Sequence, residues 1–124
     1  MIYMEIRVKN SLLHGKGVFA KRGFNKGELI EKCPVIAFSK DELKELDKTV
    51  FYNYYFSWKN GGAIALGLGS LYNHSYRPNA IYLKDFKRGF ITFRALKTIK
   101  KNEEILVNYN GKPSSRAKVW FEKV

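Results

Sequence analysis

The chain has 124 residues, and its 45% hydrophobic and 15% aromatic content supplies one core of ordinary size and argues against disorder. Its single cysteine, Cys33, excludes an internal disulfide and a cysteine-based zinc site, and suits a reducing compartment. No apolar run approaches the about 20 residues of a membrane span. With a formal net charge of +12 as well, we expect a cytoplasmic protein with no membrane partner.

The N-terminal third shows strand patterns followed by one helix pattern. Met4, Ile6 and Val8 alternate with charged residues, which predicts a strand over residues 4–8. The segments GVFAKR and GELIEKCPVIAF predict two more strands, separated by the turn signal GFNKG. Ser39 and Glu42 form a capping box ahead of apolar residues at helical spacing, so residues 39–50 are the one predicted helix.

The remainder of the chain is a series of short strand patterns. The segments GGAIALGLG, NAIYLKD, GFITFRAL and EEILVNY are apolar or alternating runs separated by glycine, proline and asparagine. The tail over residues 113–124 is compatible with a short helix or an irregular lid. The pattern as a whole predicts a mainly β fold, of the β-rich α+β class.

Positive charge is spread along the whole chain and is densest between Lys84 and Lys101. Such a surface attracts polyanions, either nucleic acid or acidic protein surfaces. A basic surface that serves only solubility explains the same charge equally well. Charge alone therefore identifies no partner.

The segment SLYNHSYRPNA contains His74, one of the two histidines of the chain. A metal site would require cysteines, carboxylates or a second histidine at ligand spacing, and His14 is remote in sequence. A serine hydrolase would require a GxSxG turn, which the sequence lacks. From these residues alone, His74 is interpreted as a turn histidine whose ring is hydrogen-bonded within the fold.

Three segments in a fixed order carry a family resemblance: HGKGVFAKRGFNKGELI, LYNHSYRPNA and KKNEEILVNYNG. Together they resemble the SET-domain family of protein lysine methyltransferases, and most of all its minimal viral and prokaryotic members without flanking zinc modules. The resemblance covers residues 7–111. It implies one SET domain over residues 1–124, with residues 112–124 as a lid or tail. The implied fold is a β-clip of several small sheets with a C-terminal pseudoknot, a crossing that no periodicity predicts.

The resemblance implies a cofactor, S-adenosylmethionine, and a reaction that transfers its methyl group to the side-chain amine of a lysine in a protein substrate. The backbone of Gly15, Lys16 and Gly17 is implied to lie against the amino-acid part of the cofactor, where a missing Cβ permits close approach. Asn73 is implied to hydrogen-bond the same moiety, and His74 to contact the adenine mainly through its backbone.

Tyr109 matches the catalytic tyrosine of the family, and it follows a strand pattern in which Ile105, Val107 and Tyr109 share one face. Without the other motifs, a core tyrosine would be the better interpretation. The aromatic run VFYNYYFSWKN supplies Tyr54 as a second catalytic-site candidate, at the lysine channel or the cofactor. Tyr72, next to the Asn-His-Ser triplet, is a further candidate for the cofactor site.

Two departures from larger family members qualify the resemblance. Tyr76 stands where many of them carry a zinc-binding cysteine, so we expect no metal. The tail must then close the site by other means, and Trp120, or Phe121 beside it, is the candidate cover for the cofactor. The chain also lacks the second tyrosine that small relatives carry shortly after the catalytic one, which leaves the degree of methylation open.

The expected partners follow from charge and from the resemblance. They are a protein that presents a lysine, a nucleic-acid-associated substrate that would bring the enzyme to chromatin or a nucleoid, and a second copy of the chain by analogy with the small viral relatives. Two other functions stay open: a basic, aromatic β-module that binds nucleic acid, and a SET-like scaffold that binds cofactor without activity.

Overall fold

Residues 5–119 are the part of the chain that the computed structural model describes. Their strands, in chain order, are β1 (Ile6–Asn10), β2 (Lys16–Ala20), β3 (Leu29–Phe38), β4 (Phe56–Trp58), β5 (Gly61–Ala65), β6 (Asn73–His74), β7 (Ala80–Asp85), β8 (Phe90–Ala95) and β9 (Glu104–Val107). One α-helix, α1 (Lys40–Leu46), and two 3₁₀ turns, η1 (Val50–Asn53) and η2 (Gly69–Leu71), accompany them. Within this range no helix is long and apolar enough to cross a membrane.

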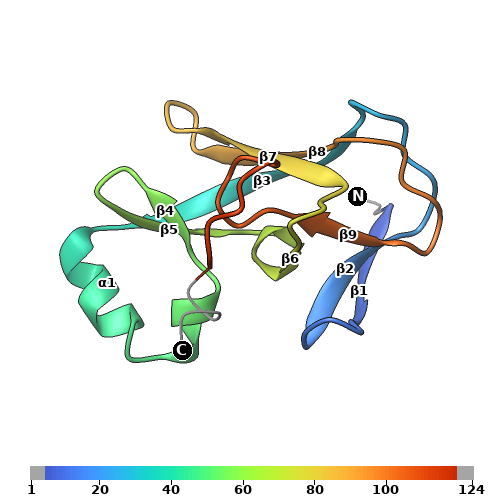
Figure 1. Cartoon of the computed structure of the whole chain (residues 1–124). Helices are drawn as coiled ribbons and strands as arrows, with labels where there is room; N and C mark the ends of the chain where they lie inside the picture. The colour runs from blue at the N-terminus through green and yellow to red at the C-terminus, as the bar shows by residue number, and fades with distance from the viewer. Residues whose placement is uncertain (1–4, 120–124) are drawn as a thin grey trace.

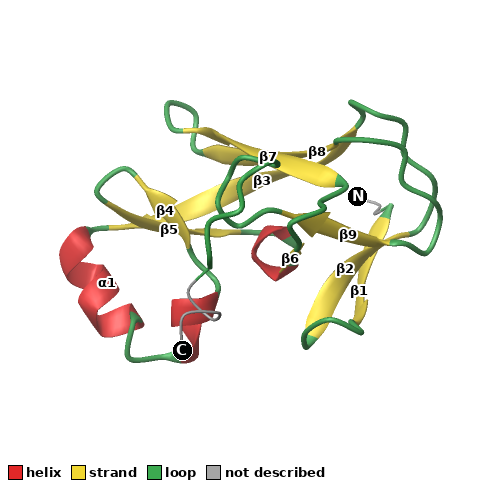
Figure 2. Cartoon of the chain, in the orientation of Figure 1, coloured by secondary structure: helices red, strands yellow, loops and turns green. Residues whose placement is uncertain are grey.

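The strands form two small sheets, which confirms the mainly β prediction (Figures 1 and 2). One sheet has the order β1-β2-β9-β6, and the other has the order β4-β5-β3-β8-β7. In the first sheet the C-terminal strand β9 lies between the N-terminal hairpin and β6, and it pairs in parallel with β6 through Asn73↔Leu106 and His74↔Val107. Segments far apart in the sequence therefore meet at the Asn-His-Ser triplet.

The core lies between the two sheets and is built from alternating strand positions. Val18 and Ile105 face it from the first sheet, while Ile91 and Phe93 face it from the second, and all four are 0% exposed. Burial of such apolar side chains removes them from water at about 25 cal/mol per Å² and is the main force that holds the sheets together.

The edge strands of the second sheet approach one another through their side chains. The rings of Phe56 on β4 and Tyr82 on β7 are 5.0 Å apart, and those of Trp58 and Phe86 are 4.7 Å apart. The sheet curls so that its edge strands β4 and β7 face each other, and the aromatic side chains of Phe56 and Tyr82 line the same cavity. The strand β4 was not predicted from the sequence, where its residues belong to the aromatic run.

The helix confirms the capping-box prediction but is shorter than expected. Ser39 Oγ accepts from the Glu42 amide at 3.2 Å, and Glu42 Oε1 accepts from the Ser39 amide at 2.8 Å. The expected helix over residues 39–50 ends at Leu46, because Thr49 caps a new turn by accepting from the Phe51 amide at 3.2 Å. This turn, η1, carries the aromatic run onward to Tyr54.

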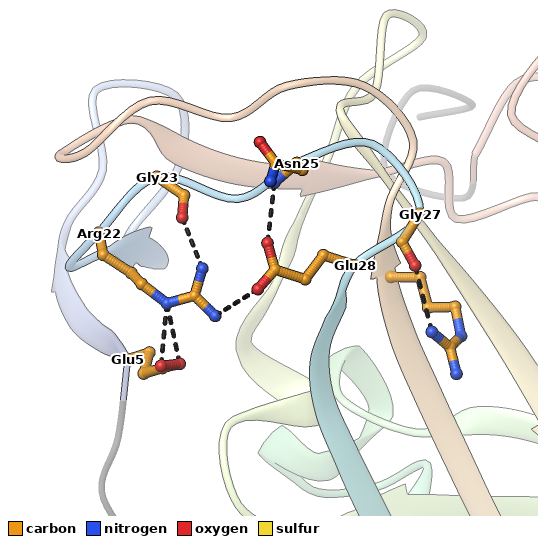
Figure 3. A network of polar contacts seen from close by, with 7 residues as sticks. Glu5, Arg22, Gly23, Asn25, Gly27 and Glu28 are labelled. Carbon is orange, nitrogen blue, oxygen red and sulfur yellow. Dashed lines mark hydrogen bonds and ion pairs between the residues drawn. The ribbon is translucent and has the colours of Figure 1, made fainter.

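An ion-pair network fixes the start of β1 to the loop before β3 (Figure 3). Arg22 donates to both carboxylate oxygens of Glu5 at 2.9 Å and to Glu28 at 2.7 Å. Its guanidinium also lies over the Phe24 ring at 4.2 Å. Hydrogen bonds from Arg22 are the largest cause that lowers the pKa of both glutamates, so this network is a local clamp on the fold, remote from the cavity.

Candidate active site

A cavity of about 200 Å³ lies where β4, β7 and the segment before β6 converge. Six aromatic residues line it, Tyr54, Tyr55, Phe56, Tyr72, Tyr82 and Tyr109, together with Asn53, Ser57, Gly69 and Ser70. The sequence predicted Tyr54 and Tyr109 here. It did not predict Tyr82, although the alternation of NAIYLKD places Ala80 and Tyr82 on the inward face.

Tyr109 is held at three points. It lies just beyond β9, and its hydroxyl donates to the Tyr72 carbonyl at 2.7 Å. Its backbone amide donates to His74 Nδ1 at 2.9 Å, and its carbonyl accepts from the Tyr82 hydroxyl at 3.0 Å. Burial raises the pKa of Tyr109 to about 12, so the phenol is protonated at neutral pH.

The ring of His74 has a structural function next to Tyr109. Because Nδ1 accepts from the Tyr109 amide, that nitrogen carries a lone pair and no proton. The ring also meets Tyr76 edge-on at 4.5 Å. The ring is hydrogen-bonded within the fold, as interpreted, but His74 lies on strand β6 and not in a turn. The expected backbone contact with an adenine stays a prediction.

The side chain of Tyr72 points into the core. Its ring stacks on Phe93 at 4.1 Å, and its hydroxyl donates to Glu31 Oε1 at 2.8 Å. The side chain is 2% exposed, and burial raises its pKa well above the usual value. The group that Tyr72 offers to the site is its carbonyl oxygen, so any contact with a cofactor would involve the backbone more than the ring.

Tyr54 follows η1 at the mouth of the cavity and is 39% exposed. Its neighbour Tyr55 donates from its hydroxyl to Asp47 at 2.8 Å, which ties the cavity wall to the end of α1. Sequence reasoning missed Tyr55 because its role depends on where the helix ends.

The turn Gly15-Lys16-Gly17 is fastened to the Asn-His-Ser triplet. Asn73 Nδ2 donates to the carbonyls of His14 and Lys16 at 3.0 Å and to Glu104 Oε2 at 2.8 Å. The Lys16 side chain donates to Asn10 at 2.9 Å, so Lys16 contributes its backbone to the turn. The structure therefore brings Gly15, Lys16, Gly17 and Asn73 together, and their role in binding a cofactor stays a prediction.

The two glycines of this turn are needed for different reasons. Gly15 has φ +46°, and a Cβ there would face open space. A Cβ on Gly17 would instead overlap the Glu104 carboxylate and the Asn73 amide. The sequence explained both glycines by close approach of a ligand; for Gly17 the close neighbours are the protein's own side chains.

These residues fit the amino-acid part of S-adenosylmethionine. Asn73 Oδ1 receives no hydrogen bond from any of residues 5–119, so it has an acceptor for an ammonium group. The space beside Gly15 lies next to the carbonyls that Asn73 organises. The carbonyl oxygens and the amide oxygen are acceptors suited to the ammonium group of a zwitterionic ligand, and the open glycine turn leaves room for it.

The C-terminal segment is fastened beside the triplet. The Tyr76 hydroxyl and Asn110 Nδ2 donate to the Ala117 carbonyl at 3.1 and 2.6 Å, and Asn108 Nδ2 donates to the Ser115 carbonyl at 2.8 Å. Val119 is buried at 4% exposure. The predicted cofactor cover, Trp120 or Phe121, lies outside the described residues. Between residues 5 and 119 no three histidine, cysteine or acidic side chains gather into a candidate metal site.

Known proteins resemble this chain in both sequence and fold. The SET domain family matches residues 15–110. A Schizosaccharomyces pombe histone-lysine N-methyltransferase, named as specific for H3 lysine-37, is 34% identical over 98% of this chain and 80% of the relative. A proposed histone methyltransferase of Plasmodium falciparum has a solved structure with TM-score 0.72 and 31% identity, over 97% of this chain and 99% of that chain.

A Chaetomium thermophilum Polycomb Repressive Complex 2 structure shares the fold at TM-score 0.73 and 23% identity, over 87% of this chain and 15% of that chain. The family match covers more than half of the chain, and the predicted motifs Gly15–Gly17, Asn73–His74 and Tyr109 lie within it. The chain therefore belongs to the SET-domain family and is a lysine N-methyltransferase.

Proposed function

We propose that the protein transfers a methyl group from S-adenosylmethionine to the side-chain amine of a lysine in a protein substrate. One observation carries this proposal: the consecutive residues Tyr72, Asn73 and His74 connect Tyr109 in the cavity wall to the turn Gly15-Lys16-Gly17. The Tyr72 carbonyl accepts from the Tyr109 hydroxyl, Asn73 fastens the turn, and His74 accepts from the Tyr109 amide. A lysine in the cavity and a cofactor at the turn would thus meet at Tyr109.

The cavity is suited to a neutral amine. A lysine side chain has a reference pKa of about 10.4 and is cationic at neutral pH. Aromatic walls such as those of Phe56 and Tyr82 replace water around the amine, which disfavours the ammonium form and lowers its pKa. The amine must lose its proton before it can act as a nucleophile, so this desolvation assists the reaction.

Tyr109 is assigned a positioning role in which it stays protonated. With its pKa raised to about 12, its phenolate would be costly at pH 7, so it is poorly suited to act as a base. Because its proton is donated to the Tyr72 carbonyl, the hydroxyl oxygen keeps lone pairs for an incoming N–H group. Tyr109 can therefore orient the amine while the proton leaves through water.

Asn73 and the backbone of Gly15, Lys16 and Gly17 would hold the cofactor. When bound, S-adenosylmethionine supplies an electrophilic methyl group on a sulfonium centre. Asn73 Oδ1 and the turn carbonyls would bind the ammonium of its amino-acid part, and the tail from Lys112 to Val119 would lie beside it. The closing role of Trp120 or Phe121 stays a prediction.

A basic protein segment, such as a histone tail, is the proposed substrate class. The Schizosaccharomyces pombe relative is named for a histone H3 lysine. In this chain the exposed acidic residues Asp41 and Glu45 lie on α1, whose end is tied to the cavity wall by the Tyr55–Asp47 hydrogen bond. Both carboxylates pair with neighbouring lysines, Asp41 with Lys44 at 3.8 Å and Glu45 with Lys48 at 3.3 Å, while Glu104 is engaged by Ser11 and Asn73. Because exposed ion pairs of this kind are worth little, a basic peptide could replace the lysines, and acidic docking is therefore proposed at α1.

The net charge of +12 supports a nucleic-acid-associated substrate, because the basic surface would attract the nucleic acid to which a histone-like protein is bound. Such a substrate would place the enzyme at chromatin or a nucleoid within a cytoplasmic or nuclear compartment. Pairing of two copies is proposed by analogy with the small viral relatives of the family.

The decisive experiment compares the wild type with Tyr109→Phe. Calorimetry should give binding of S-adenosylmethionine to both proteins, and mass spectrometry of histone H3 should give lysine methylation by the wild type. Loss of one positioning hydroxyl is expected to lower kcat about 100-fold.

Tyr52→Phe is the matched control, because Tyr52 is 45% exposed and does not line the cavity. Equal methylation by the wild type and Tyr109→Phe would refute the role of Tyr109. Absence of cofactor binding together with tight binding of nucleic acid would favour the nucleic-acid module instead.

A further inference from the structure

Glu31 is a carboxylate on the inner face of the central strand β3, close to the site but without a role in the reaction just described. Strand β3 pairs with β8 through Leu29↔Arg94 and then Glu31↔Phe93, so the register shifts between these pairs. A bulge of this kind re-aims a side chain. Because Glu31 pairs with Phe93 directly after this shift, it faces the same side of the sheet as that buried ring, where a charged residue requires partners.

Two hydrogen bonds satisfy the Glu31 carboxylate. Oε1 accepts from the Tyr72 hydroxyl at 2.8 Å, and Oε2 accepts from the Leu68 amide at 2.9 Å. Leu68 and Tyr72 flank the short turn η2, so the carboxylate holds both ends of one segment. That segment contributes Gly69 and Ser70 to the cavity wall.

The neighbouring glycine is adapted to this carboxylate. Gly67 has φ +68°, and a Cβ at that position would overlap Glu31 Oε2. The chain therefore approaches the Glu31 carboxylate at a point where only glycine fits. The register shift before Glu31, the positive φ of Gly67 and the two hydrogen bonds to the carboxylate all involve the Glu31 side chain.

The segment that Glu31 holds ends at the carbonyl that orients Tyr109. Tyr72 is fixed by Glu31 at its hydroxyl and by the Phe93 ring at 4.1 Å, and its carbonyl accepts from the Tyr109 hydroxyl at 2.7 Å. We propose that Glu31 is a positioning residue for methyl transfer, which fixes the 68–72 segment so that the Tyr72 carbonyl holds the Tyr109 hydroxyl in its reactive orientation. This proposal rests on the proposed function of the site.

The test uses Glu31→Ala, Glu31→Gln and Tyr72→Phe. Alanine removes both hydrogen bonds. Glutamine keeps an acceptor for the Leu68 amide and offers an N–H group to the Tyr72 oxygen. Tyr72→Phe removes a single hydroxyl and is the milder variant if Glu31→Ala folds poorly. Glu5→Gln, which removes a carboxylate of the Arg22 network remote from the cavity, is the matched control.

A positioning role predicts a change in kcat and not in binding. At a temperature where every variant is folded, Glu31→Ala should lower kcat about 100-fold, with the KM values for cofactor and peptide within threefold of wild type. Glu31→Gln should restore kcat to within about fivefold of wild type, and Tyr72→Phe should fall between. Ile99→Val, a core change remote from the cavity, should lower the melting temperature without lowering kcat.

Two readouts do not depend on activity. Hydrogen exchange of the Leu68 amide should accelerate in Glu31→Ala and not in Glu31→Gln. The NMR signal of the Tyr109 ring carbon that bears the hydroxyl should shift in Glu31→Ala and Tyr72→Phe and stay fixed in Glu5→Gln.

The outcomes separate this proposal from the proposed function. If the wild type methylates protein and Glu31→Ala changes neither kcat nor the Tyr109 signal, the positioning role of Glu31 is refuted. If Glu31→Ala loses cofactor binding in parallel with kcat, Glu31 is merely structural and the proposal also fails. If the wild type methylates nothing while the hydrogen exchange and the Tyr109 signal change as expected, Glu31 does fix the 68–72 segment and Tyr109, but the proposed methyl transfer fails.

Discussion

At the scale of single residues, the glycine turn beside Asn73 allows a clear comparison between Gly15 and Gly17. Gly17→Ala is expected to destabilise the protein by about 1–3 kcal/mol, because its Cβ overlaps side chains already fixed by hydrogen bonds. Gly15→Ala should cost about 1–2 kcal/mol, from the left-handed backbone alone. Denaturant unfolding of both variants without cofactor measures these free energies.

The origin of the Gly17 effect can be isolated with a double mutant. In a Glu104→Ala background the carboxylate that meets the new Cβ is gone, so Gly17→Ala should cost less than in the wild type. Gly15→Ala should cost the same in both backgrounds, because its Cβ faces open space. Equal costs for Gly17→Ala in the two backgrounds would contradict the packing explanation.

Residue identities at the site were largely predictable, but their roles were only partly so. The order of the three motifs predicted Asn73, His74 and Tyr109; in the structure a hydrogen bond joins Tyr109 to His74, while Asn73 is bonded to the glycine turn. A hydrogen-bonded His74 ring was predicted but its partner was not, and the use of the Tyr72 carbonyl and of Glu31 was not predictable. Each depends on which way a side chain turns after a bulge or a turn, and a one-residue change in register reverses that direction.

At the scale of elements, the C-terminal tail is attached by hydrogen bonds at the place where larger family members carry a zinc site. Tyr76 stands at the expected cysteine position, and its hydroxyl donates to the Ala117 carbonyl. Tyr76→Phe keeps the edge-on contact with His74 and removes one hydrogen bond, worth about 1 kcal/mol. We therefore expect about fivefold weaker cofactor binding by calorimetry, with kcat at saturation unchanged.

A second variant tests whether the tail is the cause. Asn110 also donates to the Ala117 carbonyl, so Asn110→Ala should weaken cofactor binding further when combined with Tyr76→Phe. A metal chelator should change neither affinity nor kcat in the wild type. Unchanged affinity in the double variant would mean that the tail does not contribute to the cofactor site.

The elements themselves were predicted unevenly. The alternation of β7 and β8 gave the correct elements with small shifts at the ends, and the capping box gave the correct start of α1, which ends at Leu46 instead of residue 50. Strand β4 was missed, since its three residues make a strand only through pairing with β5. The expected strand of residues 103–109 stops at Val107, because Asn108 turns its side chain to the tail carbonyls.

At the scale of the whole molecule, the aromatic cavity lies between the edge strands β4 and β7 and the segments that carry Tyr72 and Tyr109, and burial of tyrosines there dominates the titration behaviour. Burial raises the pKa of Tyr82 and Tyr109 to about 12 and that of Tyr72 well above its usual value, and it also raises the pKa of the Cys33 thiol. The carboxylates with lowered pKa values, such as Glu5 and Asp85, are exposed to solvent. The free energy of unfolding should therefore depend on pH more strongly at the alkaline end than at the acid end.

The sign of this dependence follows from where the protons are bound. Below about pH 9 these phenols are protonated in both states, whereas above about pH 10 the unfolded chain loses protons that the folded state keeps. The free energy of unfolding should therefore fall between pH 10 and 12, by about 1.4 kcal/mol per pH unit for each shifted group. Denaturant unfolding at closely spaced pH values measures this slope, which Tyr82→Phe should reduce by the contribution of one group. A wild-type slope that stays flat to pH 12 would show that the buried tyrosines ionise as readily in the folded protein as in the unfolded chain.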